Sequence, residues 1–235
     1  MSAPLGVDLD TIARGAGLGI EEVRVSGHRH ASDSDILDAL DLPNVRSMAR
    51  FDSEEARRRI ERLPWIASAE ITRVFPDRLD IRVRERRPFA IWQRGNAEIL
   101  IDETGRELQR VAPGTIEHLP RVIGEGAVSE TGQLLATIAR HDALVARFIA
   151  AERVGERRWT LHLRDGLTMH LPPDGQALAL EQLAQSGRLA WLLAQRDSIL
   201  DLRAPGRVTV RRARAGKGAV AGVQIPASVP TARRE

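Results

Sequence analysis

Residues 63–92 read LPWIASAEITRVFPDRLDIRVRERRPFAIW, and this stretch predicts a β-hairpin. Apolar and polar residues alternate along both arms, as is typical of strands with one buried face and one face in water. Pro76 and Asp77 lie between the arms and favour a turn there. The buried face is predicted to hold Ala67, Ala69, Ile71, Leu79, Ile81 and Val83.

A hairpin alone is only marginally stable, so its apolar face needs a covering helix. One is predicted directly upstream, over residues 53–63, with Asp52 as the N-cap and Glu55 completing a capping box. A shorter helix over 33–40 and a strand over 20–26 come before it. The order β-α-α-β-β over about seventy residues suits a small α+β domain.

Four short motifs occur in a fixed order in this region. They are VSG (25–27), PWIASA (64–69), FPDRL (75–79) and VRERRPFAIW (83–92). Together they resemble the POTRA domain of the FtsQ/DivIB cell-division family, most closely over residues 20–125. The resemblance implies an α+β fold, with a small βααββ POTRA domain over 20–88. A larger β domain over 89–211 would follow, an antiparallel sheet with helices on one face.

Hydrophobic periodicity predicts the elements of the larger region. They are a helix over 133–151, helices over 176–185 and 188–195 broken at Ser186-Gly187, and final strands over 198–203 and 207–211. The residues expected to be buried on the last two helices are Leu180, Leu183, Leu189, Trp191, Leu192 and Leu193.

A second hairpin, over residues 157–171, allows its register to be predicted. A two-residue turn would place Leu163 opposite Thr168, on the wrong face of the strand pair. A three-residue loop, 164–166, pairs Leu163 with Leu167 and so keeps apolar residues together. We therefore predict this loop, with Gly166 at positive φ.

Composition narrows the class of protein. The chain has 235 residues, 43% of them hydrophobic, and a net charge of +3, which predicts one or two domains and no nucleic-acid partner. The absence of cysteine excludes disulfides and thiolate metal sites. No run reaches the roughly 18 apolar residues of a membrane span. The resemblance implies the periplasmic domain of a single-pass inner-membrane protein at the division septum, with its transmembrane helix outside this chain. Residues 1–19 are expected to be a flexible juxtamembrane linker and 212–235 a disordered tail.

The sequence contains no nucleophile elbow, zinc-protease motif or phosphate loop, so no catalytic motif points to an enzyme. The pairs His28/His30 and His162/His170 lack a third ligand nearby, so solvated histidines are expected. Glu85 falls on the apolar side of its strand, where it is predicted to emerge from the core or to pair with an arginine. We predict a protein that is not an enzyme and uses no cofactor, metal or small-molecule substrate.

The function is then expected to be binding, and the last strand of an antiparallel sheet is often an open edge. The resemblance implies that the last strands accept a segment of FtsB, a small single-pass protein that sits beside FtsL. The predicted contacts are Leu200, Leu202, Arg203, Val208, Thr209 and Val210. The competing interpretation is that the apolar members of this set only form core or a protected edge.

A second surface is an arginine-rich face of the POTRA hairpin, formed by Arg73, Arg82, Arg84 and Arg86. It could bind phosphates or an acidic partner, or it could simply be a solvated strand face. The leading hypothesis is a non-catalytic scaffold of the division machinery. The alternative is a POTRA-containing periplasmic component of a protein-export or outer-membrane assembly system.

Overall fold

The computed structural model describes residues 19–42, 47–204 and 206–213. The chain divides into two compact units between Arg86 and Arg87, and each is described by itself. The predicted linker and tail lie outside the described residues, apart from Gly19 and the pair Arg212–Ala213. Gly19 forms an isolated bridge with Ser47.

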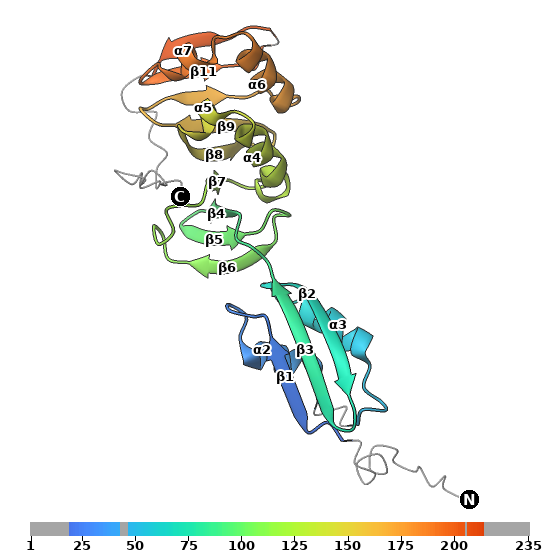
Figure 1. Cartoon of the computed structure of the whole chain (residues 1–235). Coiled ribbons are helices and arrows are strands. Elements are labelled where there is room, and N and C mark those ends of the chain that lie inside the picture. Colours follow the sequence, from blue (N-terminus) through green and yellow to red (C-terminus); the bar gives the residue numbers. More distant parts are fainter. Residues whose placement is uncertain (1–18, 43–46, 205, 214–235) are drawn as a thin grey trace, which may run out of the picture. The chain divides into compact units, whose positions relative to one another are not determined.

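The small unit has the predicted β-α-α-β-β order (Figure 1). Its elements are β1 (Glu22–Ser26), α2 (Asp33–Leu40), α3 (Ser53–Glu61), β2 (Ile66–Val74) and β3 (Arg78–Glu85). The sheet order is β1-β3-β2, with β1 parallel and β2 antiparallel to the central β3. The predicted N-cap of α3 is confirmed, because an Asp52 carboxylate oxygen accepts the backbone N–H groups of Glu54 and Glu55 at 3.0 Å.

The core of the small unit lies between the hairpin and its two helices. Leu79, Ile81 and Val83 are at most 3% exposed, as their alternation predicts. In β2 the register shifts between Ile66 and Ser68, so Ile66 is buried and Ala67 is not a core residue. The shift adds one residue to β2, and this reverses the face on which the preceding residues lie.

The large unit confirms the α+β class. Its elements are β4 (Ala90–Arg94), β5 (Ala97–Ile101), β6 (Glu107–Val111), β7 (Arg121–Ile123), the 3-10 turn η1 (Val128–Glu130), α4 (Thr131–Ala139), α5 (Asp142–Val145), β8 (Phe148–Val154), β9 (Arg158–Leu163), β10 (Thr168–His170), α6 (Gln176–Gln185), α7 (Leu189–Leu193), β11 (Ser198–Asp201) and β12 (Thr209–Arg212). They build one nine-stranded sheet in the order β12-β11-β10-β9-β8-β7-β4-β5-β6. Figure 1 shows the helices α4 to α7 together on one side of this sheet.

The sheet is mixed and not antiparallel, which corrects the expectation from the sequence. The pairs β4–β7, β7–β8 and β10–β11 are parallel. Parallel neighbours need a long crossover, and the helices supply two of them. The pair α4 and α5 joins β7 to β8, and the pair α6 and α7 joins β10 to β11.

The helix predicted over 133–151 is wrong in its second half. Helix α4 ends at Ala139, the short α5 follows, and Phe148 and Ile149 begin strand β8. Strand β8 pairs with β7 on one side and β9 on the other. These long-range pairings decide the conformation of a segment whose local apolar spacing fits a helix equally well.

The register predicted for the second hairpin is confirmed. Leu161 pairs with Met169, and the Leu163 N–H donates to the Leu167 carbonyl at 2.8 Å. Gly166 has φ of +68°, as a three-residue loop requires. Asp165 also has positive φ, which the sequence did not predict.

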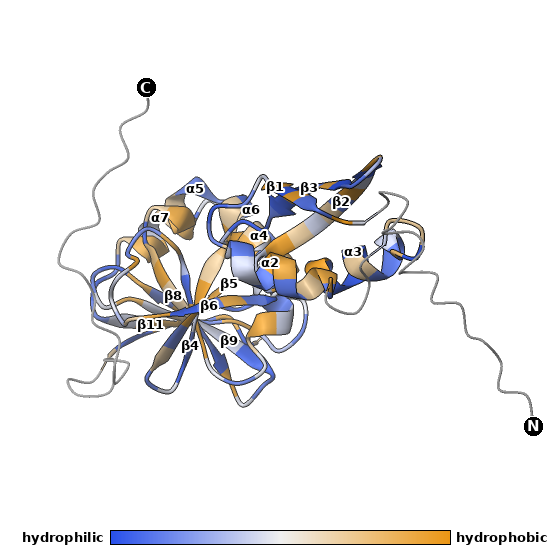
Figure 2. Cartoon of the chain, turned by 90° about the horizontal axis from the view of Figure 1, so that it is seen from below, coloured by the Kyte–Doolittle hydropathy of each residue, from blue (hydrophilic) through white to orange (hydrophobic). Residues whose placement is uncertain are grey.

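The break between α6 and α7 is also as predicted, but Trp191 is not buried. Helix α7 turns Leu189, Leu192 and Leu193 into the core and leaves Trp191 62% exposed. Figure 2 shows how apolar this short helix is along its length. A five-residue helix cannot bury all its faces, so counting its apolar residues overestimates how many of them are buried.

Candidate functional site: the β12 edge

Strand β12 is the last strand of the nine-stranded sheet. It pairs with β11 on one side, and among the described residues no strand pairs with it on the other. All four of its residues are exposed. The predicted open edge is therefore present in the part of the chain that the structure describes.

The ladder also shows which backbone groups of β12 face outward. The Ala213 N–H donates to the Asp197 carbonyl at 2.7 Å, in the same register as the β11–β12 pairs. In an antiparallel ladder every second pair is hydrogen-bonded. Val210 and Arg212 occupy the alternate positions, so their N–H and C=O groups point away from β11 and toward the open side.

Two of the predicted contact residues are not available to a partner. Leu200 and Leu202 are 0% and 5% exposed and belong to the core of the large unit. They face the helices. The sequence pattern could not reveal this, because apolar residues at these positions fit a buried strand and an edge strand equally well. Val208 and Val210 are each 39% exposed, and Thr209 is exposed as well.

Arg203 is held by its own chain. Its Nε donates to Asp201 Oδ1 at 2.8 Å, and its backbone N–H donates to the same oxygen at 3.1 Å. The Arg203 side-chain hydrogen bond is the main cause that lowers the pKa of Asp201 to about 2. To bind an acid on a partner, Arg203 would have to share or exchange this carboxylate.

The edge is electropositive. Arg207, Arg211 and Arg212 are exposed, and no acidic side chain pairs with them among the described residues. On β10, which pairs with β11 and not with β12, burial is the main cause that lowers the pKa of His170; the charges of Arg203 and Arg211 lower it further, and that of Asp201 raises it.

A groove of about 290 Å³ lies between α6 and the segment that leads into β12. Its apolar lining includes Leu178, which is 61% exposed, together with Val208 and the buried Leu183. Arg203 and Arg207 stand at the same groove. The edge strand therefore adjoins an apolar surface with basic side chains.

The arginines predicted for the POTRA surface separate into two pairs. Arg73 donates to the Phe51 carbonyl at 2.7 Å, and Arg86 donates to the Ile66 carbonyl at 3.1 Å, so both hold the fold together. Arg82 and Arg84 are exposed on β3. Glu70 lies 3.7 Å from Arg82, which makes this face mixed in charge instead of basic.

Glu85 performs a structural task that the sequence did not reveal. Its Oε1 accepts the backbone N–H groups of Arg29, His30 and Ala31 at 2.7 to 2.8 Å. Its Oε2 lies 2.9 Å from Nδ1 of His30, whose ring stacks on Trp65 at 4.3 Å. Burial raises the pKa of Glu85, but the hydrogen bonds from Ala31, Arg29 and His30 outweigh it and bring the pKa to about 2.

The other three histidines of the predicted pairs, His28, His162 and His170, are only partly exposed and also have protein partners, so the prediction of solvated side chains is wrong for these three. His28 lies 3.0 Å from Asp33 and His162 lies 3.0 Å from Glu152. His170 Nδ1 lies 3.0 Å from the Thr160 hydroxyl. Across the described ranges, no three His, Asp or Glu side chains gather in a way that could hold a metal ion. No described helix has the length and apolar character needed to cross a bilayer.

Comparisons with known proteins give a consistent family. Residues 18–86 match the family model for the POTRA domain, FtsQ-type, and residues 90–203 match that for the cell division protein FtsQ/DivIB, C-terminal. Cell division protein FtsQ of Bartonella bacilliformis is 33% identical over 83% of this chain and 63% of its own length. FtsQ of Rhizobium meliloti (strain 1021) is 34% identical over 83% of this chain and 63% of its own length. FtsQ of Caulobacter vibrioides (strain NA1000 / CB15N) is 32% identical over 86% of this chain and 67% of its own length.

The chain thus spans a little under two thirds of the first of these relatives. Among solved structures, the major extracytoplasmic domain of the trans isomer of DivIB from Geobacillus stearothermophilus aligns with a TM-score of 0.34 and 18% identity. That alignment covers 44% of this chain and 92% of the DivIB chain.

Proposed function

This chain belongs to the FtsQ/DivIB family of cell division proteins, and we propose that it is a non-catalytic scaffold of the division machinery. The scaffold links early and late division proteins by binding other chains. The observation that carries the proposal is the open β12 edge, with the backbone groups of Val210 and Arg212 directed outward.

Strand addition is the mode of binding that this edge supports. A partner segment in extended conformation would pair with β12, and its main-chain hydrogen bonds would supply affinity. Val208 and Val210 would contact alternate side chains of the added strand and so fix its register. On the strength of the family resemblance, the partner is FtsB, with FtsL beside it.

The charge and shape of the site suggest the chemistry of the partner segment. Arg207, Arg211 and Arg212 favour a segment with acidic residues, since opposite charges steer encounter and select partners. The groove beside Leu178 and Val208 would receive an apolar side chain next to the added strand. Arg203 would contribute only after sharing Asp201 with the partner.

Family membership also suggests where the scaffold works. We propose the periplasmic side of the inner membrane at the division septum, with one transmembrane helix on the N-terminal side of this chain. The exposed pair Arg82 and Arg84 on the small unit is a further surface that could serve recruitment to the septum. This role is weaker than that of β12, because Glu70 partly neutralises that face.

Depletion of the encoded protein in its own organism tests the function class. A division scaffold predicts long undivided cells with normal amounts of outer-membrane proteins. Restoring the full-length protein should restore division. Normal division together with loss of outer-membrane proteins would contradict the scaffold and favour an export or assembly role.

A further inference from the structure

The large unit carries a second apolar depression, far from β12 in the strand order. It has a volume of about 810 Å³ and crosses the ends of several strands. The parallel strands β4, β7 and β8 begin there: Phe89 directly precedes β4, and Arg121 and Phe148 are the first residues of β7 and β8. Helices α4 and α5 form one wall. We refer to this feature as the strand-end trough.

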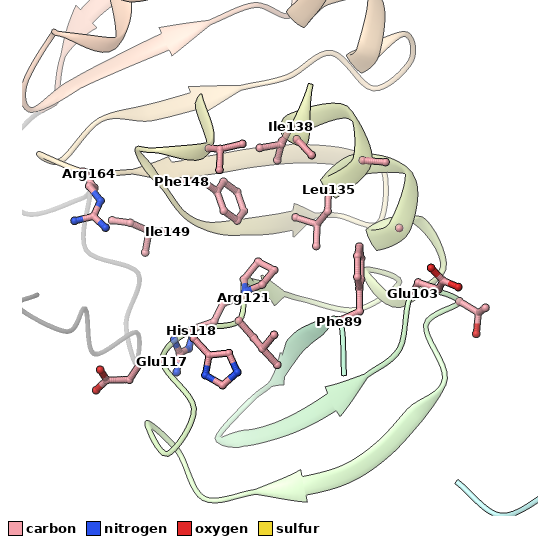
Figure 3. Close-up of a pocket in the computed structure, with 17 residues that line it drawn as sticks. Phe89, Glu103, Glu117, His118, Arg121, Leu135, Ile138, Phe148, Ile149 and Arg164 are labelled. Carbon is pink, nitrogen blue, oxygen red and sulfur yellow. The ribbon is translucent and has the colours of Figure 1, made fainter. Parts of the chain in front are cut away.

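The floor of the trough is apolar and reachable. Phe89 and Phe148, two of the four phenylalanines in the chain, line it with Leu135 and Ile138. Val145 on α5 also lines the trough and is 49% exposed. Figure 3 shows the side chains of Leu135 and Ile138 from α4 and of Phe89 and Phe148 from the strand ends converging on the trough. Large exposed apolar depressions on soluble proteins are commonly binding sites for a ligand or a partner protein.

An added strand cannot occupy the trough. The strands that end there, β5, β4, β7, β8 and β9, are all interior strands with a neighbour on each side. Their backbone groups are already paired within the sheet, so a partner must be recognised by its side chains. An amphipathic helix laid into a groove is recognised in this way, whereas strand addition depends on free main-chain groups.

The wall formed by α4 is suited to a helix. Ala136 and Ala139 face the trough, and both are exposed. Small residues on an exposed helix face allow another helix to approach closely, so that its apolar side chains can reach the floor. Gly132, one turn before Ala136, is a small residue for another reason: a Cβ at this position would lie 2.6 Å from the Glu103 carbonyl oxygen.

The charges at the two ends of the trough differ. Glu103 lies at one end, while Glu117 and Arg164 lie apart from each other on the opposite side (Figure 3). Glu103 has no ion-pair partner among the described residues. Arg121 contributes no free charge, because it is 7% exposed and its guanidinium lies 3.5 Å from Glu98. A complementary ligand therefore carries a basic residue at the Glu103 end.

From these observations we propose that the strand-end trough is a second docking site, which binds one amphipathic helix of a partner protein. The helix presents apolar side chains at positions i, i+3 or i+4, and i+7, and a lysine or arginine near Glu103. This site is separate from the β12 edge and goes beyond the proposed strand addition. It would let the scaffold hold two partners at once.

A displayed library of 14-residue amphipathic helices with randomised end charges tests the proposal. It is selected against the intact chain, and the enriched peptides are then measured by fluorescence anisotropy. We expect peptides with a basic end. Ala136→Arg should weaken them at least about tenfold by filling the trough. Glu103→Lys should weaken them about three- to fivefold, as one exposed ion pair allows, and should favour peptides with an acidic end.

Two control variants separate this site from the rest of the protein. Ala190→Arg makes the same change at an exposed position on α7 and should leave binding unchanged. Val210→Asp changes the β12 edge and should also have no effect. The proposal is overturned if no helix binds saturably, if Ala136→Arg binds the peptides normally, or if Val210→Asp abolishes binding. If the chain self-associates and Ala136→Arg abolishes that self-association, the trough binds a second copy of the chain, and the proposal is likewise overturned.

Discussion

Replacement of Val210 by proline is expected to weaken binding of FtsB about ten- to hundredfold, with little change in the free energy of unfolding. Proline removes the outward N–H, which leaves a partner carbonyl unpaired at a cost of about 1 to 3 kcal/mol. The β11–β12 ladder does not use that N–H, and edge strands tolerate proline where the N–H faces solvent. The affinity is measured by titration calorimetry with the part of FtsB outside its membrane span.

Val210→Thr is the matched control for this substitution. Threonine keeps the N–H and the β-branched shape and loses only apolar contact, so its affinity should fall far less than that of Val210→Pro. Val208→Asp and Val210→Asp should also weaken binding, because each introduces a charge beside the added strand. Equal affinities for Val210→Pro and the unchanged chain would rule out pairing at β12.

Glu85→Gln is expected to destabilise the small unit by about 2 to 3 kcal/mol at neutral pH. Folding lowers the pKa of Glu85 from its ordinary 4.5 to about 2, and each pKa unit corresponds to about 1.4 kcal/mol. Glutamine keeps the shape but accepts the three loop N–H groups without a charge. The measurement is a urea titration in which NMR amide signals of β3 report the unfolding of this unit.

The pH dependence of the same difference identifies its cause. Because the folded-state pKa lies below the unfolded one, the stabilisation is complete at neutral pH and is lost as the pH falls from about 5 toward 2. The difference between the unchanged chain and Glu85→Gln should fall to about half at pH 3. Glu70→Gln, at a side chain 69% exposed, should show no such difference. A difference that is independent of pH would contradict the charged cap.

Local patterns predicted those parts of the fold in which neighbouring residues decide the structure. The small-unit hairpin, the Asp52 cap and the three-residue loop before Leu167 follow from alternation, capping and turn chemistry. The helix predicted over 133–151 failed because β8 is defined by its pairing with β7 and β9. The prediction of an antiparallel large sheet failed for the same reason, because the direction of each strand depends on where the crossover connections return the chain.

The open edge was predicted in position but not in detail, and partner binding at this edge stays a prediction. An edge at the last strand follows from chain order, and β12 is such an edge. The sequence could not show that Leu200 and Leu202 face the core, because their apolar character suits an interface and a core equally well. The Glu85 cap joins residues more than fifty positions apart, and the strand-end trough collects residues from many elements. Neither leaves a local signal.

Amide hydrogen exchange of β12 is the most direct test of binding at its open edge. In the free chain, the outward N–H groups of Val210 and Arg212 should exchange rapidly, whereas the inward N–H of Ala213 should be protected by the Asp197 carbonyl. Saturating FtsB should slow exchange at Val210 and Arg212 and leave residues around the strand-end trough unchanged. Tight FtsB binding with no new protection at these two amides would contradict strand addition at β12.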